Sequence, residues 1–535
     1  MRAIFRMYPK AHVQVRTAVG LCLFLLFLIH DHPAWSKDNP PSSPVVDPAA
    51  GQPVAMGPSK FLKLLVERSV EIQYARKSAE VSHFLAEGER GLYEPTAFIT
   101  PRIEGRRRQR TAEEITQNIF TQNEPVLTEQ GRSGEIGLRQ KLPSGAEMAI
   151  SYKFSRKSNN LISLTATQDT EFNASLNLTI KQPLLRNAGR SITETDLKIS
   201  ELEDQVAAQQ FQQQISKSAI EGLAQYWQVY REQAMVQLLQ DSIIKTEDLI
   251  ASTRARAKAG LVADSTALEA QSALLNRQAE LARGERYLKE SQSRLATMLD
   301  LDWSSSWTLF VSPTPTEESP PTTIEDPSDQ KSLNQWHPYQ VANLKLQQAR
   351  VRLAFAANQT RPSVDFVMSY AGTGYSLDPI DTRNTAFQRR FPDWYVGINV
   401  EIPIKGNQRA QQHVLAQQAR LEQATVDVDA IERSFMNDLR IRRKALDLAL
   451  LNLNANRDEE KLRQEIFNIE QRRMRLGIGS LGETIRRYFE LVDASKHLIE
   501  SRANYETAAA TLMYTQGKLL SAHGILVVLQ NDGAN

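Results

Sequence analysis

Two long stretches of this 535-residue chain contain no proline, and they share the same internal spacing. Gly189 precedes Gly260 by 71 residues, and Gly406 precedes Gly477 by 71 residues as well. Both stretches are rich in Ala, Gln, Leu, Glu and Arg. Because proline costs about 3 kcal/mol inside a helix, proline-free stretches of this composition favour long helices. The matching spacing predicts a tandem duplication in which each half carries two long helices.

The first of these helices would cover residues 191–258, a length of about 100 Å at 1.5 Å per residue. Apolar residues recur in it at steps of three and four, as at Leu223, Tyr226 and Tyr230. Such a narrow apolar stripe is typical of a coiled coil, and its many alanines allow helices to approach closely. An ordinary long bundle shows the same pattern, so the helices alone leave both architectures open.

Four shorter segments alternate between apolar and polar residues: 148–154, 172–180, 364–370 and 394–402. This alternation predicts strands with one apolar and one polar face, which suit either a half-buried soluble sheet or a membrane sheet. In each half the strands lie between a first helix and two long helices. Small membrane barrels need about eight strands, and lipid does not tolerate an open sheet edge. If these strands span a membrane, several copies of the chain must share one barrel.

The N-terminal residues 1–36 have the features of a secretory signal peptide. Basic residues precede an apolar run over 18–29, and 34–36 offer a small-x-small cleavage site. A short membrane anchor that is retained is the alternative. The only cysteine, Cys22, lies in this segment, so the processed chain would contain no thiol. No other segment approaches 18 consecutive apolar residues, which leaves a soluble exported protein or a β-barrel.

The rest of the chain divides at two proline-rich linkers. The predicted parts are a linker over 37–58, a first repeat over 59–311 with an insertion at 102–163, a second linker over 312–332, a second repeat over 333–520 and a tail over 521–535. Within the insertion, 135–142 and 146–154 flank Pro143-Ser144-Gly145, which predicts a β-hairpin. The sequence leaves open whether this hairpin extends the sheet or lies outside it.

With these parts in order, the chain resembles the TolC-like outer-membrane efflux protein family. The resemblance lies in two strand ends, 178–185 followed by Gly189-Arg190 and 400–404 followed by Gly406. It implies turns of two kinds. The strand-to-helix turns would contain Pro183, Gly189, Pro403 and Gly406, and the helix-to-helix turns at the periplasmic tip would contain Gly260, Gly477 and Gly479.

The resemblance implies a mainly α-helical fold with membrane β-structure, in which three chains contribute four strands each to one outer-membrane β-barrel. The long helices would continue it as a coiled-coil tunnel in the periplasm. The expected function is a channel for passive exit in tripartite efflux or type I secretion, not an enzyme. The expected partners are two further copies, a periplasmic adaptor, an inner-membrane transporter and outer-membrane lipid. Alternatives are a periplasmic adaptor and a structural coiled-coil protein of the cell envelope.

Members of that family narrow the periplasmic end with acidic side chains just after the second tip turn, where this chain has Glu483. One turn later, where relatives carry a second acid, this chain has Arg486, which predicts an ion pair between neighbours on a helix. Asp264, near the first tip turn, is a further candidate for the constriction. The alternative for these residues is a solvated helix face.

No other class of site is predicted. The formal net charge of +2 gives no reason to expect a nucleic-acid partner. The histidines lack metal-ligand spacing, and no nucleophile motif is present. We therefore expect no catalytic residue, no bound metal and no cofactor.

Overall fold

The computed structural model describes residues 54–116, 125–161, 170–258, 264–301, 309–311, 329–404 and 406–525. These residues belong to one compact unit, Pro53–Asn535. The predicted signal peptide, most of the first linker, the turn that contains Gly260 and residues 312–328 of the second linker lie outside the described residues.

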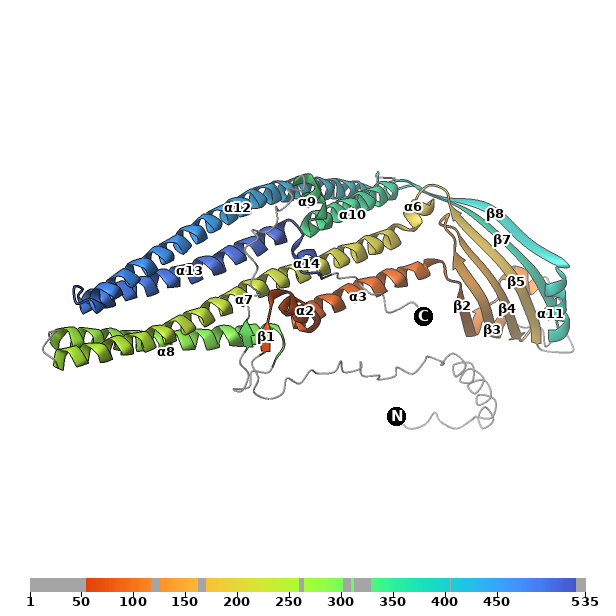
Figure 1. Ribbon diagram of the computed structural model, residues 1–535. Coiled ribbons are helices and arrows are strands. Elements are labelled where there is room, and N and C mark those ends of the chain that lie inside the picture. Colours follow the sequence, from red (N-terminus) through yellow and green to blue (C-terminus); the bar gives the residue numbers. More distant parts are fainter. Residues whose placement is uncertain are drawn as a thin grey trace, which may run out of the picture. The chain divides into compact units, whose positions relative to one another are not determined.

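Long helices dominate the described chain, and their order repeats (Figure 1). The first half contains α3 (Val70–Arg90), α7 (Thr195–Lys258) and α8 (Asp264–Met298), and the second contains α10 (His337–Gln359), α12 (Gln408–Arg475) and α13 (Leu481–Thr515). The last helix of each half, α8 or α13, has 35 residues. The predicted internal repeat is therefore visible in the element order. Among the described residues, none of the helices has both the length and the apolar character needed to cross a bilayer.

Six strands form one antiparallel sheet. In spatial order they are β2 (Thr96–Gln109), β3 (Val126–Lys141), β4 (Glu147–Asn159), β5 (Thr170–Pro183), β7 (Ser363–Ser376) and β8 (Phe391–Glu401). The four predicted strands are all present, and the predicted hairpin of the insertion forms β3 and β4 between β2 and β5. The expectation of four strands per chain is therefore wrong, because the hairpin bonds to strands on both of its sides.

The register of the sheet aligns apolar residues across all six strands. One row contains, in order, Ala97, Leu138, Ile150, Leu178, Tyr370 and Trp394. A row on the opposite face contains Thr100, Glu135, Lys153, Ser175 and Thr373 on the first five strands. Successive side chains of a strand point to opposite faces, so the sheet has one apolar and one largely polar face.

A short helix covers part of the apolar face. Helix α11 (Pro379–Gln388) connects β7 to β8 and packs on β7 and β5. Gly372 and Gly374 allow this close approach, since a Cβ atom at Gly374 would lie 2.2 Å from the carbonyl oxygen of Thr382. Phe387 of α11 stacks on Tyr152 of β4 at 5.5 Å between ring centroids. The uncovered part of this face remains exposed.

The main helical core surrounds the middle of α7. It includes residues of α2 (Pro58–Arg68), of α8, and of the parallel pair β1 (Val54–Met56) and β6 (Leu309–Val311). Its central aromatic pair is Phe61 and Tyr226, whose ring centroids lie 5.5 Å apart. The Tyr226 hydroxyl donates a hydrogen bond to the carbonyl oxygen of Met56 at 2.8 Å.

The ends of the predicted linkers and the start of the tail are ordered. Residues 54–56 form β1 and Met56 is buried, so an extended, poorly packed linker over 37–58 is wrong for its last residues. Helix α9 (Asp329–Gln335) begins inside the predicted second linker. The predicted tail begins within α14 (Leu519–Ala522), and Ile525 joins the core. Tertiary burial of apolar side chains explains these local departures.

The remaining short elements connect the larger ones. They are η1 (Gly91–Tyr93), α4 (Ala112–Thr116) and α6 (Arg190–Thr193). Helices α3 and α10 end just before β2 and β7, while α6 and α12 begin just after β5 and β8. Because neighbouring strands run in opposite directions, all four connections lie at the same end of the strands (Figure 1).

We predict that Phe61→Ala lowers the free energy of unfolding by about 3–5 kcal/mol, because it removes a fully buried ring. Thermal unfolding of the purified protein, followed by circular dichroism, would measure the change. Lys63→Ala, at an exposed position of the same helix, should stay within about 0.5 kcal/mol of the original protein. Equal effects of the two substitutions would contradict the central place of Phe61 in the core.

Candidate functional site

The turn between α12 and α13 depends on a glycine. Gly477 has a φ of +79°, in the left-handed region where side chains with a Cβ atom are strained. Its N–H donates to the carbonyl oxygen of Met474, and the N–H of Ile478 donates to that of Arg473, both at 3.1 Å. These two bonds form a Schellman motif, which satisfies carbonyl groups at the end of α12. The predicted tip turn of the second half is therefore a well-defined helix end.

The chain then turns directly into α13. Gly479 lies so close to the end of α12 that an added Cβ atom would be 2.7 Å from the backbone nitrogen of Met474. Ser480 is the N-cap residue of α13, and its carbonyl oxygen accepts a hydrogen bond from the Thr484 hydroxyl at 3.1 Å. The structure therefore explains both predicted glycines of this turn. Gly477 has a positive φ, and Gly479 packs closely against the end of α12.

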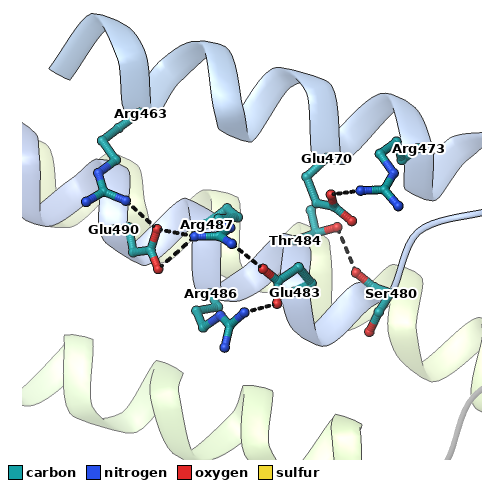
Figure 2. A network of polar contacts seen from close by, with 9 residues as sticks. All are labelled: Arg463, Glu470, Arg473, Ser480, Glu483, Thr484, Arg486, Arg487 and Glu490. Atoms are coloured by element: carbon teal, nitrogen blue, oxygen red, sulfur yellow. Dashed lines mark hydrogen bonds and ion pairs between the residues drawn. The ribbon is translucent and has the colours of Figure 1, made fainter. Parts of the chain in front are cut away.

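Glu483 lies in the first turn of α13 and pairs with two arginines (Figure 2). Its Oε2 atom accepts a hydrogen bond from Arg486, which is the predicted pair. Its Oε1 atom lies 2.8 Å from Nη2 of Arg487. The hydrogen bond from Arg486 and the charges of both arginines lower the pKa of the Glu483 carboxyl below its usual range. Glu483 is therefore a charged side chain held by its own helix.

The network continues along α13 and crosses to α12 (Figure 2). Arg487 also pairs with Glu490 at 2.9 Å, and Glu490 pairs with Arg463 of α12 at 2.8 Å. On α12 itself, Glu470 pairs with Arg473 at 3.3 Å. The pair between Arg487 and Glu490 was not predicted from the sequence, although a spacing of three residues on a helix was a usable signal. Arg463 had no such signal, because it belongs to another helix.

A second ionic cluster joins α13 to α8. Arg277 of α8, whose side chain is only 10% exposed, lies 3.4 Å from Asp493 of α13. Lys496 of α13 lies 3.0 Å from Glu280 of α8, and Arg277 also pairs with Glu280 at 2.8 Å. Burial alone raises the pKa of Glu280, but hydrogen bonds from Lys496 and Arg277 and the charges of both lower it below the usual value. This cluster ties the two helical hairpins together, and it was not predicted from the sequence.

Apolar side chains hold the same region together. One cluster contains Leu249 and Ile250 of α7, Phe467 and Met474 of α12, and five residues of α13: Leu481, Ile485, Tyr488, Leu491 and Val492. The apolar stripe of α13 therefore faces the other helices, while Glu483 and Arg486 lie on its more exposed side. Arg486 is 63% exposed and Glu483 is 29% exposed.

The other predicted site residues fall in three groups. Asp264 is the first residue of α8, while Gly260 lies outside the described residues. Pro183 is the last residue of β5, and Gly189, with a φ of +93°, precedes α6. Pro403 and Gly406 precede α12, and Gly406 has a φ of +75°.

The strand-to-helix turns of both halves bond to the end of helix α10. The backbone N–H of Asn187 donates to the side-chain oxygen of Asn358 at 2.8 Å, and Asn187 accepts a bond from Gln359 at 2.6 Å. Asn407 donates to the backbone oxygen of Gln359 at 3.1 Å. These contacts connect the strand ends of both halves. Within the described residues, no group of His, Cys, Asp or Glu side chains is placed to hold a metal ion.

Comparisons with known proteins show the fold. No protein-family model matches the chain. No curated protein sequence matches it. The solved outer-membrane channel OprN matches with a TM-score of 0.62 and 12% identity over 86% of this chain and 90% of that chain. The outer membrane protein VceC of Vibrio cholerae matches with a TM-score of 0.58 and 10% identity over 86% of this chain and 96% of that chain.

The open state of the outer-membrane channel MtrE of Neisseria gonorrhoeae has a TM-score of 0.58 and 13% identity, over 86% of this chain and 89% of that chain. The chain therefore has the fold of outer-membrane channels. The predicted fold class, a long helical assembly with a β-sheet at one end of its helices, is confirmed.

We predict that Gly477→Ala destabilises the α12–α13 turn by about 1–2 kcal/mol, since a Cβ atom is strained in the left-handed region. Thermal unfolding, together with faster amide hydrogen exchange of residues 470–485, would measure this effect. Gly88→Ala is the matched control, because Gly88 lies inside helix α3 with free space around its added Cβ atom. It should stabilise the protein by about 0.5–1 kcal/mol, so a loss of stability in both variants would contradict the assignment.

Proposed function

We propose that this chain is the outer-membrane subunit of an efflux or type I secretion channel and gives substrates passive exit from the periplasm. The observation that carries the proposal is the exposed apolar face of the six-stranded sheet, in a chain with the fold of outer-membrane channels. The solved structures that share this fold are named as channels, and we propose the same function for this chain.

The apolar face supports a place in lipid. On β8, Trp394, Val396, Ile398 and Val400 point to this face and are each between 53% and 67% exposed. On β2, Ile99 and Ile103 are 61% and 83% exposed. An exposed apolar surface of this kind is unfavourable in water and marks a contact with lipid or protein. The opposite face, with Glu135, Lys153 and their neighbours, suits a water-filled lumen.

An assembly of several copies follows from the same proposal, because one sheet cannot close on itself in lipid. We propose three copies, as the family resemblance implies. Copies of the chain would join their sheets into one wall and their helices into one tunnel. The tips of the two helical hairpins would then be the periplasmic end, where a periplasmic adaptor and an inner-membrane transporter dock. The transporter supplies the energy, and the channel itself is no enzyme.

Glu483, Arg486 and Asp264 would lie near the entrance in this arrangement. A ring of three bare carboxylates would attract cations strongly. Here each Glu483 carboxylate is paired with Arg486 and Arg487, so the ring carries little net charge. We propose that these pairs hold the first turn of α13 in place at the constriction.

The adaptor alternative predicts a single helical hairpin beside a lipoyl-like β-domain. The described residues form two hairpins, α7 with α8 and α12 with α13, together with one six-stranded sheet. The repeated strand-to-helix turns also disfavour a purely structural coiled-coil protein. Both observations favour the channel.

We expect the protein purified from outer membranes to be a detergent-dependent trimer that forms ion-conducting pores in planar lipid bilayers. Native mass spectrometry would give the number of copies, and single-channel recording would give the conductance. A water-soluble monomer with no pore activity would overturn the proposal.

We expect Glu483→Ala to raise the single-channel conductance, because it removes the shared partner of Arg486 and Arg487 at the constriction. Glu500→Ala, an exposed acid farther along α13, should leave conductance unchanged. An unchanged conductance in Glu483→Ala would remove this residue from the constriction without affecting the channel assignment.

The same pairs predict a response to pH. The pKa of Glu483 is lowered below the ordinary value by its pairing with the two arginines, so its carboxylate keeps its charge to a more acidic pH than an unpaired glutamate. The pairs stabilise the folded tip above the unfolded pKa and are lost only as pH falls through the lower folded value. Conductance changes that depend on Glu483 should therefore have their midpoint at a more acidic pH than the pKa of an ordinary glutamate, and should be absent in Glu483→Gln. A transition of this kind near neutral pH would contradict the pairing.

A further inference from the structure

The hairpin β3–β4 is bonded into the middle of the sheet, not attached to its edge. Thirteen residue pairs join β3 to β4, from Glu129 with Asn159 to Lys141 with Glu147. β2 pairs with β3 over its whole length, and β4 pairs with β5 from Glu147 to Ser158. β2 and β5 are therefore separated by two strands. Removing the hairpin from the sheet would break its hydrogen bonds to β2 and to β5.

The hairpin also shares the two-faced character of the sheet. Leu138 and Ile150 lie directly opposite each other on the apolar face and are 51% and 45% exposed. Glu135 and Lys153 are opposite each other on the polar face. With 16 and 13 residues, β3 and β4 exceed the roughly 9–11 residues that a tilted strand needs to span a membrane.

The turn of the hairpin is fixed to the strand-to-helix turn of the first half. Gly145 has a φ of +87°, and an added Cβ atom would lie 2.5 Å from the carbonyl oxygen of Asn187. The N–H of Gly189 donates to the carbonyl oxygen of Ser144 at 3.0 Å. The side chain of Gln182 accepts a bond from the Ser144 hydroxyl at 2.7 Å. These contacts hold the turn of the hairpin at the end of the sheet that is connected to the helices, beside the neighbouring strand ends.

From these observations we infer that each copy contributes six strands to the membrane wall, and that β8 of one copy pairs with β2 of the next. This inference rests on the proposed function. Because six is even and the strands alternate in direction, β8 runs opposite to β2, so the next copy continues the antiparallel order. Both edges are exposed along nearly their whole length and so are open to such pairing.

Three copies would then close a wall of eighteen strands. At about 4.8 Å between strands and a tilt of about 40°, the diameter between backbones would be roughly 36 Å. Twelve strands would give roughly 24 Å on the same basis. An eighteen-stranded wall encloses an open aqueous channel. Control of passage would therefore fall on the helical end, and the lumen would admit larger solutes at the membrane level.

The experiment measures which face of the hairpin contacts lipid. In a Cys22→Ser background the chain has no other cysteine, so single cysteines can carry a fluorescent label. Ile150→Cys tests the apolar face of β4, and Lys153→Cys tests its polar face. In vesicles of phosphatidylcholine and phosphatidylglycerol, bromine-labelled acyl chains should quench the label at Ile150 at least threefold more than aqueous iodide does. The label at Lys153 should show the reverse preference.

Strand β8 supplies the matched control, with Val396→Cys on the apolar face and Asp393→Cys on the other. Lipid quenching at Val396 together with iodide quenching at Ile150 would place the hairpin outside the membrane and overturn the inference, while the channel proposal would stand. If Val396 itself were not quenched from lipid, the proposed function would fail instead. Lipid quenching at both Ile150 and Val396 supports six strands.

The seam between copies has its own test. Ile99→Cys on β2 is combined in turn with Trp394→Cys, Val396→Cys and Ile398→Cys on β8, and the trimer is treated with a thiol oxidant. At least one pair should give covalent dimers and trimers in denaturing electrophoresis. Leu138→Cys on β3 replaces Ile99→Cys in the control series and should give none, because β2 lies between β3 and the seam. Cross-linking through Leu138 alone would overturn the proposed seam.

Discussion

Backbone hydrogen bonding at the two edges of the sheet sets the condition that the rest of the structure has to meet. β2 and β8, with 14 and 11 residues, are unpaired on their outer sides within the described chain. In lipid, each unpaired N–H or C=O group costs several kcal/mol. An apolar face that favours lipid is therefore compatible with these edges only if another copy pairs with them. The even strand number and the polar second face agree with that requirement.

Much of the architecture was predictable because it rests on local periodicity. The strict alternation at Phe172–Ile180 and at Trp394–Val400 indicated β5 and β8, and the proline-free tracts indicated the long helices. β2 was missed because Pro101 and the run Arg106–Arg108 obscure its alternation. The three-residue strands β1 and β6 were missed because their pairing depends on contacts between distant parts of the chain.

Some contacts of the candidate site were likewise predictable from the sequence, and others were not. Glu483 and Arg486 are three residues apart on one helix, so their pairing followed from spacing alone. Gly477 was found from the repeat, and its positive φ supplies the physical reason for a glycine there. Arg277 and Asp493 are 216 residues apart and meet only because α8 packs beside α13. No periodic signal in one sequence connects such residues. The role of Glu483 in a constriction stays a prediction.

The two ionic clusters lie at different distances from the turn between α12 and α13. Arg277 and Lys496 tie α8 to α13 about three to four helical turns beyond Leu481, where α13 begins. Nearer the turn, the pairs of Glu483 stay within α13, and Glu490 connects it only to its own hairpin partner α12. In that segment the hairpins pack through apolar side chains, among them Leu249 and Ile250 of α7, and Tyr488 of α13 lies beside Ser242 of α7. The Arg277 cluster and these apolar contacts therefore join the two hairpins at successive levels of α13, the first by paired charges and the second by burial.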